Sequence, residues 1–230
     1  MTHRPHVLLS VATSIDGHID DAAPERLLLS NPADLDRVDE VRAGVDAILI
    51  GAETIRRDNP RLLVNSALRR RQRRDRGEPD YPLKVTITAS GDLDPALQFW
   101  HHGDRKLAYT TDTGAALLRE RLRALTTVDV VSLGPTIDFA ALLDDLGARG
   151  IRRLMVEGGQ QVHTGLLAAG LVDEIHLAIA PLLVGHADAP RFLGPADYPT
   201  GPTGRMRLAG TETIGDVVLL RYLPKQESTA

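Results

Sequence analysis

The sequence predicts an α/β fold with a mostly parallel sheet and a C-terminal antiparallel hairpin. Short apolar runs of strand length alternate along most of the chain with segments whose apolar residues recur at helical spacing, which is the pattern of parallel-sheet proteins. The last two strand-like runs follow each other closely and are joined near Gly215, which is typical of a hairpin. The 230 residues contain no linker-like stretch, so we expect a single domain over residues 1–230.

The strands are expected where apolar runs end in turn residues. The first, from His6 to Ala12, is closed by the turn Ser14-Ile15-Asp16-Gly17. The expected strands cover residues 6–12, 45–50, 83–88, 106–110, 128–132, 151–156, 174–180, 205–213 and 217–223.

The helices are expected where capping residues precede an apolar face. Asn31 is an N-cap with Pro32 at the first helical position, Gly44 ends that helix, and Asp138 caps another. The expected helices cover residues 32–43, 115–125, 139–146 and 160–169. Two segments are expected to form neither strand nor helix. The arginine-rich stretch 69–77 is expected to be a mobile basic loop, and 185–204 is expected to be a loop rich in Gly and Pro.

Composition excludes several classes of function. The chain has no cysteine, which excludes disulfides, thiolate nucleophiles and Cys-ligated zinc. Its eight histidines have no metal-ligand spacing and are expected in solvated loops, so no metal site is expected. The net charge of −4 and an aromatic content of 3% argue against a nucleic-acid partner. No signal peptide or membrane-spanning run is found, so no membrane partner is expected and the cytoplasm is the expected location.

Two clusters at expected strand ends could carry chemistry. Glu157-Gly158-Gly159 stands between a buried strand and a helix, where small residues and free N–H groups suit a phosphate. The alternative is a tight turn in which Glu157 merely caps the helix. The second cluster, around Thr54 and Asp58, ends in the turn-forming stretch Asp58-Asn59-Pro60. If the strands are parallel, both clusters lie at the same edge of the sheet.

Taken together, the motifs resemble a known family. These motifs are Ser14-Ile15-Asp16-Gly17, the stretch from Arg42 through Asp46, Gly51 and Thr54 to Asp58-Asn59-Pro60 and Leu62, then Val156-Glu157-Gly158-Gly159, Gly170-Leu171-Val172-Asp173-Glu174, Ala180-Pro181 and Gly185. In this order they resemble the pyrimidine reductases of riboflavin biosynthesis, the reductase half of the bifunctional deaminase–reductase, which is related to dihydrofolate reductase.

The resemblance implies a dihydrofolate-reductase-like three-layer fold, NADPH as cofactor, a small-molecule substrate and a homodimer, with the deaminase domain absent. It implies that the ribosyl group of a ribosylamino-pyrimidine 5′-phosphate is reduced to ribityl. The cofactor contacts that it implies are Ala12, Thr54, Asp58, Ser90, Gly158, Gly159, Gln160, Gln161, Val162, His163, Thr164 and Gly165. The implied substrate contacts are Arg42, Leu62, Asn65 and Glu157, and Glu157 is the best candidate for the catalytic proton donor.

Three departures leave the substrate open. His18 stands where the family usually has Lys or Arg, and Asn65 stands where many members have an arginine that would hold the substrate phosphate. Arg26 or a neighbour occupies a position that is often Ser. The arginine-rich loop could close on that phosphate instead. The alternatives are a related NADPH reductase of another heterocycle, such as dihydrofolate or a pterin, and a non-catalytic pyrimidine- or flavin-binding protein.

Overall fold

The computed structural model describes residues 3–23, 25–202 and 204–224. The chain divides into two compact units. The first consists of Asp39–Met155 together with the N-terminal residues up to Pro5, and the second consists of His6–Val38 and the residues from Val156 onward. Each unit is built on hydrogen-bonded strands that are covered by helices.

The first unit contains parallel strands in the order β5-β4-β3-β2. The bounds of the strands are β2 Ala47–Gly51, β3 Leu83–Thr88, β4 Lys106–Thr110 and β5 Val128–Ser132. Next to β2 follows β6 (Arg153–Gly158), whose first three residues belong to this unit and whose last three belong to the second. β2, β3 and β4 are buried along nearly their whole length, as strands covered on both faces must be.

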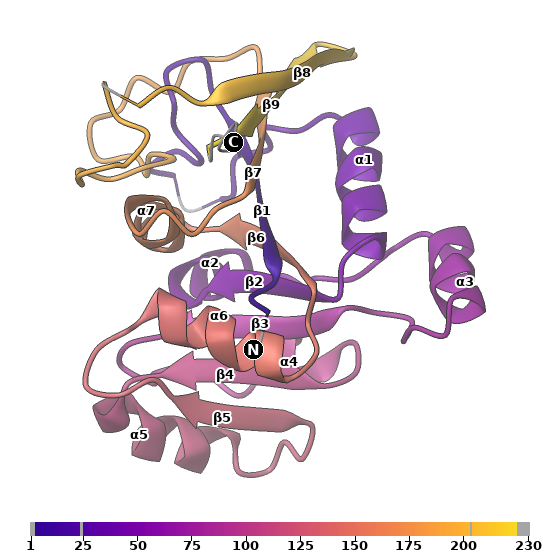
Figure 1. Ribbon diagram of the computed structural model, residues 1–230, viewed down its shortest axis with the longest axis vertical. Coiled ribbons are helices and arrows are strands. Elements are labelled where there is room, and N and C mark those ends of the chain that lie inside the picture. The colour runs from indigo at the N-terminus through magenta and orange to yellow at the C-terminus, as the bar shows by residue number, and fades with distance from the viewer. Residues whose placement is uncertain (1–2, 24, 203, 225–230) are drawn as a thin grey trace. The chain divides into compact units, whose positions relative to one another are not determined.

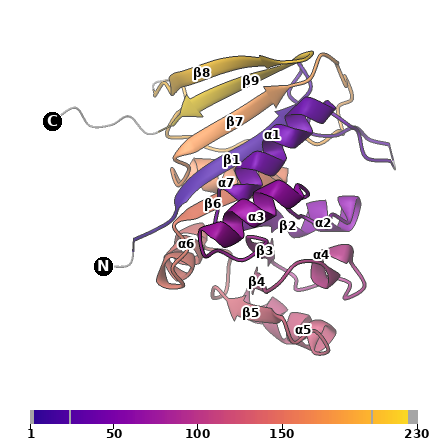
Figure 2. The same ribbon diagram turned by 90° about the vertical axis from the view of Figure 1, so that its right-hand side faces the viewer.

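The helices of the first unit cover both faces of these strands. They are α2 Ala52–Asp58, α3 Ala67–Asp75, α4 Gln98–His101, α5 Asp112–Leu122 and α6 Phe139–Ala148. From β2 to β5 the chain moves one way along the strand order, and from β5 to β6 it moves back. Because such crossovers are right-handed, α6 must lie on the face opposite α2, α4 and α5. Figure 2 shows this arrangement.

The second unit continues the strand order from β6 as β6-β1-β7-β9-β8. The strands are β1 His6–Thr13, β7 Glu174–Ile179, β8 Arg207–Ile214 and β9 Val217–Leu223. β1 and β7 are parallel, whereas β9 is antiparallel to both β7 and β8. Helices α1 (Pro32–Ala43) and α7 (Gln160–Ala168) lie on opposite sides of β1 and β7 (Figure 1). The residues of α1 from Asp39 onward belong to the first unit.

Asn31 connects the start of α1 to the β8–β9 hairpin. Its side-chain oxygen accepts a hydrogen bond from the Asp34 N–H at 2.9 Å, as expected for an N-cap. Its amide nitrogen donates to the Ile214 carbonyl at 2.6 Å and to Asp216 at 2.8 Å. The turn at Gly215, with φ of 64°, is therefore held against the helix start.

Most of the elements predicted from the sequence are confirmed. The bounds of β3, β4, β5 and β9 agree with the prediction, and the α/β class with a mostly parallel sheet and an antiparallel hairpin is correct. The described residues of 185–204 contain no helix or named strand, as expected. Helices α2 and α4 were not predicted.

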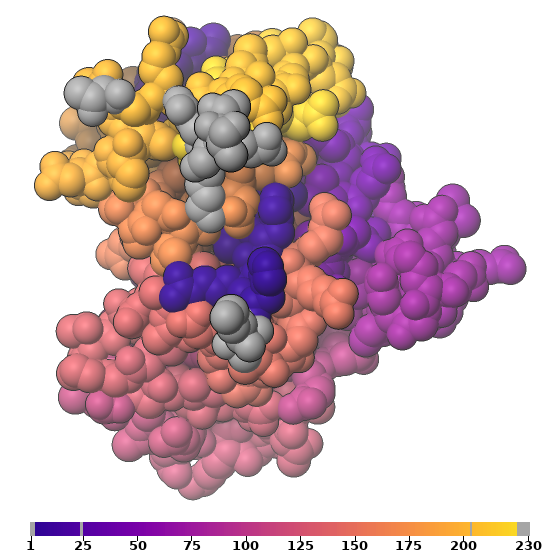
Figure 3. Space-filling model, in the orientation of Figure 1, coloured from indigo at the N-terminus to yellow at the C-terminus, as the bar shows by residue number. Residues whose placement is uncertain are grey.

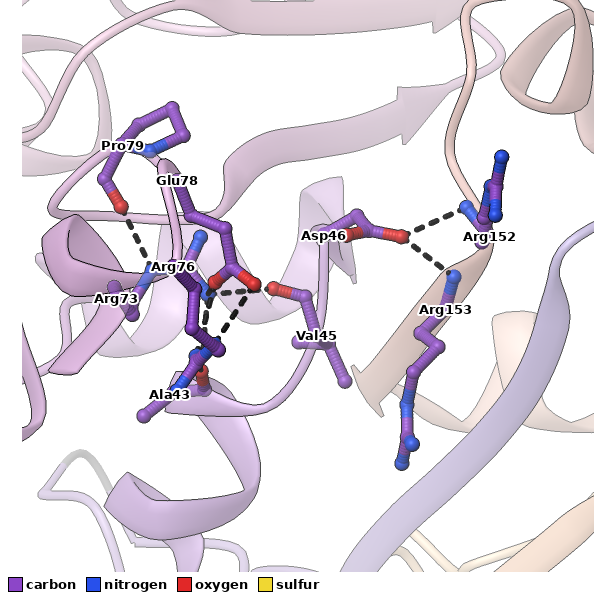
Figure 4. A network of polar contacts seen from close by, with 9 residues as sticks. All are labelled: Ala43, Val45, Asp46, Arg73, Arg76, Glu78, Pro79, Arg152 and Arg153. Carbon is purple, nitrogen blue, oxygen red and sulfur yellow. Dashed lines mark hydrogen bonds and ion pairs between the residues drawn. The ribbon is translucent and has the colours of Figure 1, made fainter.

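The prediction of a mobile loop at 69–77 is wrong. This stretch forms most of helix α3, whose N-cap Ser66 accepts a hydrogen bond from the Arg69 N–H. The helix forms because the arginines find acceptors within the unit. Arg73 is 2% exposed and donates to the carbonyls of Ala43, Val45 and Pro79 at 2.8–3.0 Å (Figure 4).

The turn at Ser14–Gly17 is bonded to the loop that follows β7. The Asp16 carboxylate accepts hydrogen bonds from the Ser14 hydroxyl and from the N–H groups of Val184 and Gly185. These bonds hold the pKa of Asp16 well below its usual value. The expected turn is thus confirmed, with a left-handed Gly17 at φ of 84°. In the described part of the chain, no helix is long and apolar enough to cross a bilayer.

Candidate active site

In the second unit, the candidate site is built where β6 passes into α7. Glu157 and Gly158 are the last two residues of β6, and Gly159 is the N-cap of α7. Gly158 has φ of 141°, a conformation that favours glycine, and the Gly158–Gly159 peptide bond is cis. The N-cap makes no side-chain hydrogen bond to the first turn of the helix. The predicted strand–glycine pair–helix arrangement is therefore confirmed as a conformation, with Glu157 half-buried at the strand end.

The residues of α7 differ in what they offer to a ligand. Val162 is 5% exposed and His163 is fully buried, so their side chains belong to the core. Thr164 accepts a hydrogen bond from the Gly194 N–H at 2.9 Å, and it thereby holds the loop that follows β7. Gln161 is exposed, whereas Gln160 and Gly165 are half-buried. Contacts with a cofactor along this stretch would thus come from its main chain and its glutamines.

Ala12 lies near the end of β1, the strand next to β6 in the strand order. It is half-buried and packs against a core cluster of the second unit that includes Ala178, its register partner on β7.

The expectation that the histidines are solvated is wrong for three of them. His18 is 1% exposed, and its Nδ1 lies 3.1 Å from the Ala189 carbonyl. His176 is 9% exposed and lies 2.8 Å from Glu174, and burial lowers its pKa. His163 packs edge-to-face against Phe192, and burial lowers its pKa to about 4. These rings therefore belong to the interior of the second unit.

In the first unit, the residues implied as cofactor contacts lie near strand ends. Thr54 and Asp58 are half-buried on α2, the short helix that directly follows β2. Asn59 ends this helix in a left-handed conformation, φ 42°, which confirms the predicted turn. Ser90 is exposed just after β3, and its hydroxyl accepts a hydrogen bond from the Asp92 N–H at 3.2 Å.

The residues of the first unit that were implied as substrate contacts gather near the end of α1. Arg42, in the last turn of that helix, donates from Nη1 to the Leu63 carbonyl at 3.1 Å. Leu62 is 4% exposed and has a left-handed φ of 52°, while Asn65 is exposed three residues later. Arg42 is thus bonded to the segment that carries Leu62 and Asn65.

The site residues therefore form two groups, one in each unit. Glu157, Ala12 and the start of α7 belong to the second unit, and the remaining residues belong to the first. Sequence reasoning missed Asp39, Arg70 and Lys84, which bond to the segment that carries Leu62 and Asn65. The spacing of Asp39 and Arg42, one helical turn apart, was the signal that could have drawn attention to this face of α1. Among the described residues, no cluster of His, Asp or Glu could hold a metal ion.

The structure resembles solved reductases. A pyrimidine reductase-like protein from Corynebacterium diphtheriae superposes with a TM-score of 0.77 at 24% identity, covering 97% of this chain and 93% of that one. The fold is therefore that of the dihydrofolate-reductase-like reductases. The chain belongs to the family of the RibD C-terminal domain, whose sequence model matches residues 5–220.

Curated relatives agree with this assignment. A protein of Archaeoglobus fulgidus is 34% identical over 189 residues, which is 81% of this chain and 85% of the relative. A protein of Methanothermobacter thermautotrophicus is 31% identical over 223 residues, which is 96% of this chain and 99% of the relative. Both are named 2,5-diamino-6-ribosylamino-4(3H)-pyrimidinone 5′-phosphate reductase. The chain is thus a reductase of this family.

Proposed function

We propose that this chain is an NADPH-dependent reductase that converts a ribosylamino-pyrimidine 5′-phosphate to its ribitylamino form in riboflavin biosynthesis. The observation that carries the proposal is the shared name of the two relatives, which match most of this chain at 31–34% identity. That name specifies the diamino-pyrimidinone as the relatives' substrate, so it is the first substrate to test.

The start of α7 fits a phosphate-bearing cofactor. The first turn of a helix presents N–H groups without partners inside the helix, and the N-cap Gly159 places no side chain over them. We assign Ala12, Thr54, Asp58, Ser90 and the stretch 158–165 to NADPH. When bound, this cofactor supplies a hydride from its nicotinamide ring.

The remaining residues would hold the substrate. Reduction adds a hydride to C1′ of the ring-opened sugar imine and a proton to the imine nitrogen. We assign Arg42, Leu62 and Asn65 to binding, and Glu157 to binding and to supplying the proton. The carboxyl of Glu157 lies half-buried at a strand end next to two glycines, where it is suited to form hydrogen bonds with one edge of a polar ring.

We also propose that the enzyme is a cytoplasmic homodimer, as the resemblance of the sequence implies. Sedimentation equilibrium over a range of concentrations tests the dimer, and cell fractionation tests the location. A monomer at micromolar concentration would contradict the first of these assignments.

The function is tested by anaerobic incubation of the purified chain with NADPH and one candidate substrate at a time. The panel contains the diamino-pyrimidinone ribosyl phosphate, the deaminated amino-uracil analogue, dihydrofolate and a simple ketone. We expect loss of NADPH absorbance with one of the two ribosylamino compounds, and the ribitylamino product in mass spectrometry. Turnover of dihydrofolate alone would reassign the substrate, and no turnover of any compound would contradict the proposal.

Cofactor binding is tested separately by thermal denaturation. A ligand present at 100 times its Kd adds about 2.7 kcal/mol to the free energy of unfolding. NADPH should therefore raise the melting temperature, and NADH should raise it less. No shift with either nucleotide would exclude the assigned cofactor.

A further inference from the structure

The segment between α2 and α3 is held in an unusual way. Residues 61–66 have no helix or strand structure, and they carry Leu62 and Asn65. Their main-chain groups are bonded by charged side chains rather than by a neighbouring strand. A segment held in this way depends on a few specific residues for its conformation.

The main chain of Asn65 is held on both sides. The Asp39 carboxylate accepts hydrogen bonds from the N–H groups of Asn65 and, at 3.1 Å, of Ser66. From the other side, Nη1 of Arg70 donates to the carbonyls of Val64 and Asn65, at 2.8 and 2.7 Å. Asp39 comes from α1 and Arg70 from α3, so two helices fix two consecutive peptide units, those on either side of the Asn65 Cα.

Two further basic side chains support the start of the segment. Lys84 donates from Nζ to the Arg61 carbonyl at 2.9 Å, and Arg42 donates to the Leu63 carbonyl. Hydrogen bonds with a charged partner are roughly twice as strong as neutral ones. The segment is thus fixed from α1, α3 and β3 without any β-ladder.

Arg70 and Asp39 are themselves committed to this task. Among the described residues, the Arg70 guanidinium is bonded to main-chain oxygens and lies over the Tyr81 ring, 5.9 Å from its centroid. Asp39 is 5% exposed and also pairs with Arg69 at 3.1 Å. Neither group is oriented as a free ligand for a phosphate. Arg70 therefore acts on the protein's own main chain. The expectation that the arginine-rich stretch closes on the substrate phosphate stays a prediction.

We propose that Arg70 and Asp39 are positioning residues for substrate binding: they set the main chain of 61–66 so that Leu62 and Asn65 meet the substrate. This inference rests on the proposed function, because that function supplies the substrate roles of Leu62 and Asn65. Neither Arg70 nor Asp39 touches the substrate; each acts through the segment.

The test compares Arg70→Gln with Arg74→Gln. Arg74 is in the same helix and also makes two hydrogen bonds, at 2.7 and 2.8 Å, but its partner is the side chain of Asp80, which lies outside the segment 61–66. We expect Arg70→Gln to raise the KM for the ribosylamino-pyrimidine phosphate roughly tenfold, the order of one charge-assisted bond pair, with a smaller effect on kcat. The Kd for NADPH should be unchanged. Arg74→Gln should leave the KM, the kcat and the Kd for NADPH unchanged. Arg70→Lys should raise the KM less than Arg70→Gln does, because an ammonium can donate to both carbonyls.

A second measurement follows the segment itself, without substrate. Hydrogen–deuterium exchange of the Asn65 and Ser66 amides should be faster in Arg70→Gln than in the wild type, and unchanged in Arg74→Gln. If Arg70→Gln fails to fold, as judged by its melting curve, Asp39→Asn takes its place with the same expected results. Unchanged exchange would show that Arg70 does not hold the segment, and faster exchange with an unchanged KM would overturn the positioning role.

The two proposals fail in different ways. If the wild type turns over no ribosylamino-pyrimidine phosphate, the proposed function fails and the positioning role for that substrate falls with it. The exchange measurement still decides whether Arg70 and Asp39 fix the segment. If the wild type is active but Arg70→Gln has the same KM as the control Arg74→Gln, the positioning role alone is overturned.

Discussion

Lys84 on β3 and Lys106 on β4 are register partners in the first unit, and both are buried. They are 1% and 3% exposed. The chain has only three lysines against 24 arginines, so two of the three lie side by side in this core. Lys84 donates to the carbonyls of Arg61 and Phe99, and Lys106 donates to the Gly103 carbonyl at 3.0 Å. Burial, with a smaller contribution from the Lys106 charge, lowers the pKa of Lys84 to about 7.

This pair makes stability depend on pH above neutrality. The unfolded chain holds the Lys84 proton up to about pH 10.5, whereas the folded chain releases it near pH 7. Because the unfolded state binds more protons in this interval, the free energy of unfolding should rise from pH 7 to about 9.5. Lys84→Met should flatten that rise. Urea denaturation at a series of pH values, followed by fluorescence of the single tryptophan, Trp100, measures it; an equal slope in the variant would contradict the assignment.

His163 should make the second unit sensitive to acid. Its folded pKa of about 4 lies below the ordinary value of 6.5, so the unfolded chain takes up a proton first as the pH falls. The stability that the neutral ring confers is present above pH 6.5 and is lost towards pH 4, to a total of about 3 kcal/mol. In His163→Leu the fall between pH 6.5 and 5 should be smaller. Circular dichroism during urea denaturation checks this, and identical slopes for both proteins would exclude His163 as the source.

Arg73 is expected to be the most important arginine of α3 for stability. Arg73→Met removes the donor to the Val45 and Pro79 carbonyls and leaves the Ala43 carbonyl with Arg76. It also leaves Glu78, now 3.2 Å from the Arg73 guanidinium, without one of its cations. Removing one partner of a buried charged network costs about 3–5 kcal/mol. Arg105→Gln, which breaks an exposed pair with Asp129, should cost less than about 1 kcal/mol. Urea denaturation of both variants tests the contrast, and equal losses would show that burial of Arg73 is unimportant.

Gly114 permits a close approach between the start of α5 and the loop after β3. A Cβ at this position would lie 2.3 Å from the Thr110 hydroxyl oxygen and 2.7 Å from the Ala89 carbonyl oxygen. Gly114→Ala should therefore cost about 1–3 kcal/mol of stability, as overpacking does. Gly44→Ala is the control, because its Cβ would meet nothing closer than 3.5 Å. A thermal melt that ranks the two variants equally would contradict this explanation.

Glu157→Gln tests the proposed proton donor. The substitution keeps the shape of the side chain and removes its charge and its acidic proton. Turnover should fall by roughly 100-fold, the lower end for loss of a general acid, while NADPH binding should persist. Stopped-flow single-turnover kinetics separates chemistry from binding. Turnover at the wild-type rate would leave Glu157 as a residue of the strand end without a role in catalysis.

The sequence predicts the sheet well because strand signals are local. The apolar runs at 83–88, 106–110 and 128–132 are bounded by turn or charged residues, and the structure keeps those bounds. The position of Glu157 at the end of a buried strand follows from the same kind of signal. Expectations of this type depend on neighbours in sequence alone.

Helix α3 shows where such reasoning ends. Its composition indicates a solvated loop, and the acceptors that make it a helix, Ala43 and Val45, lie 28–30 residues before Arg73. The buried histidines were missed for the same reason, since the ring of His163 is covered by Phe192 from a distant loop. Likewise, the bonds of Asp39 and Arg70 to the segment 61–66 exist only once three elements have come together.

The side-chain bonding of residues 61–66 also has a consequence for the order of folding. A strand can form as soon as its neighbour is present, but this segment requires α1, α3 and β3 to be in place before its main-chain groups are satisfied. We therefore expect the entropic cost of ordering this segment to be met late in folding, after the hydrophobic core of the unit has condensed. In the space-filling view of Figure 3, the purple-magenta region of the chain that contains α3 forms part of the surface. A substitution such as Arg70→Gln should consequently speed unfolding and leave the rate of folding nearly unchanged.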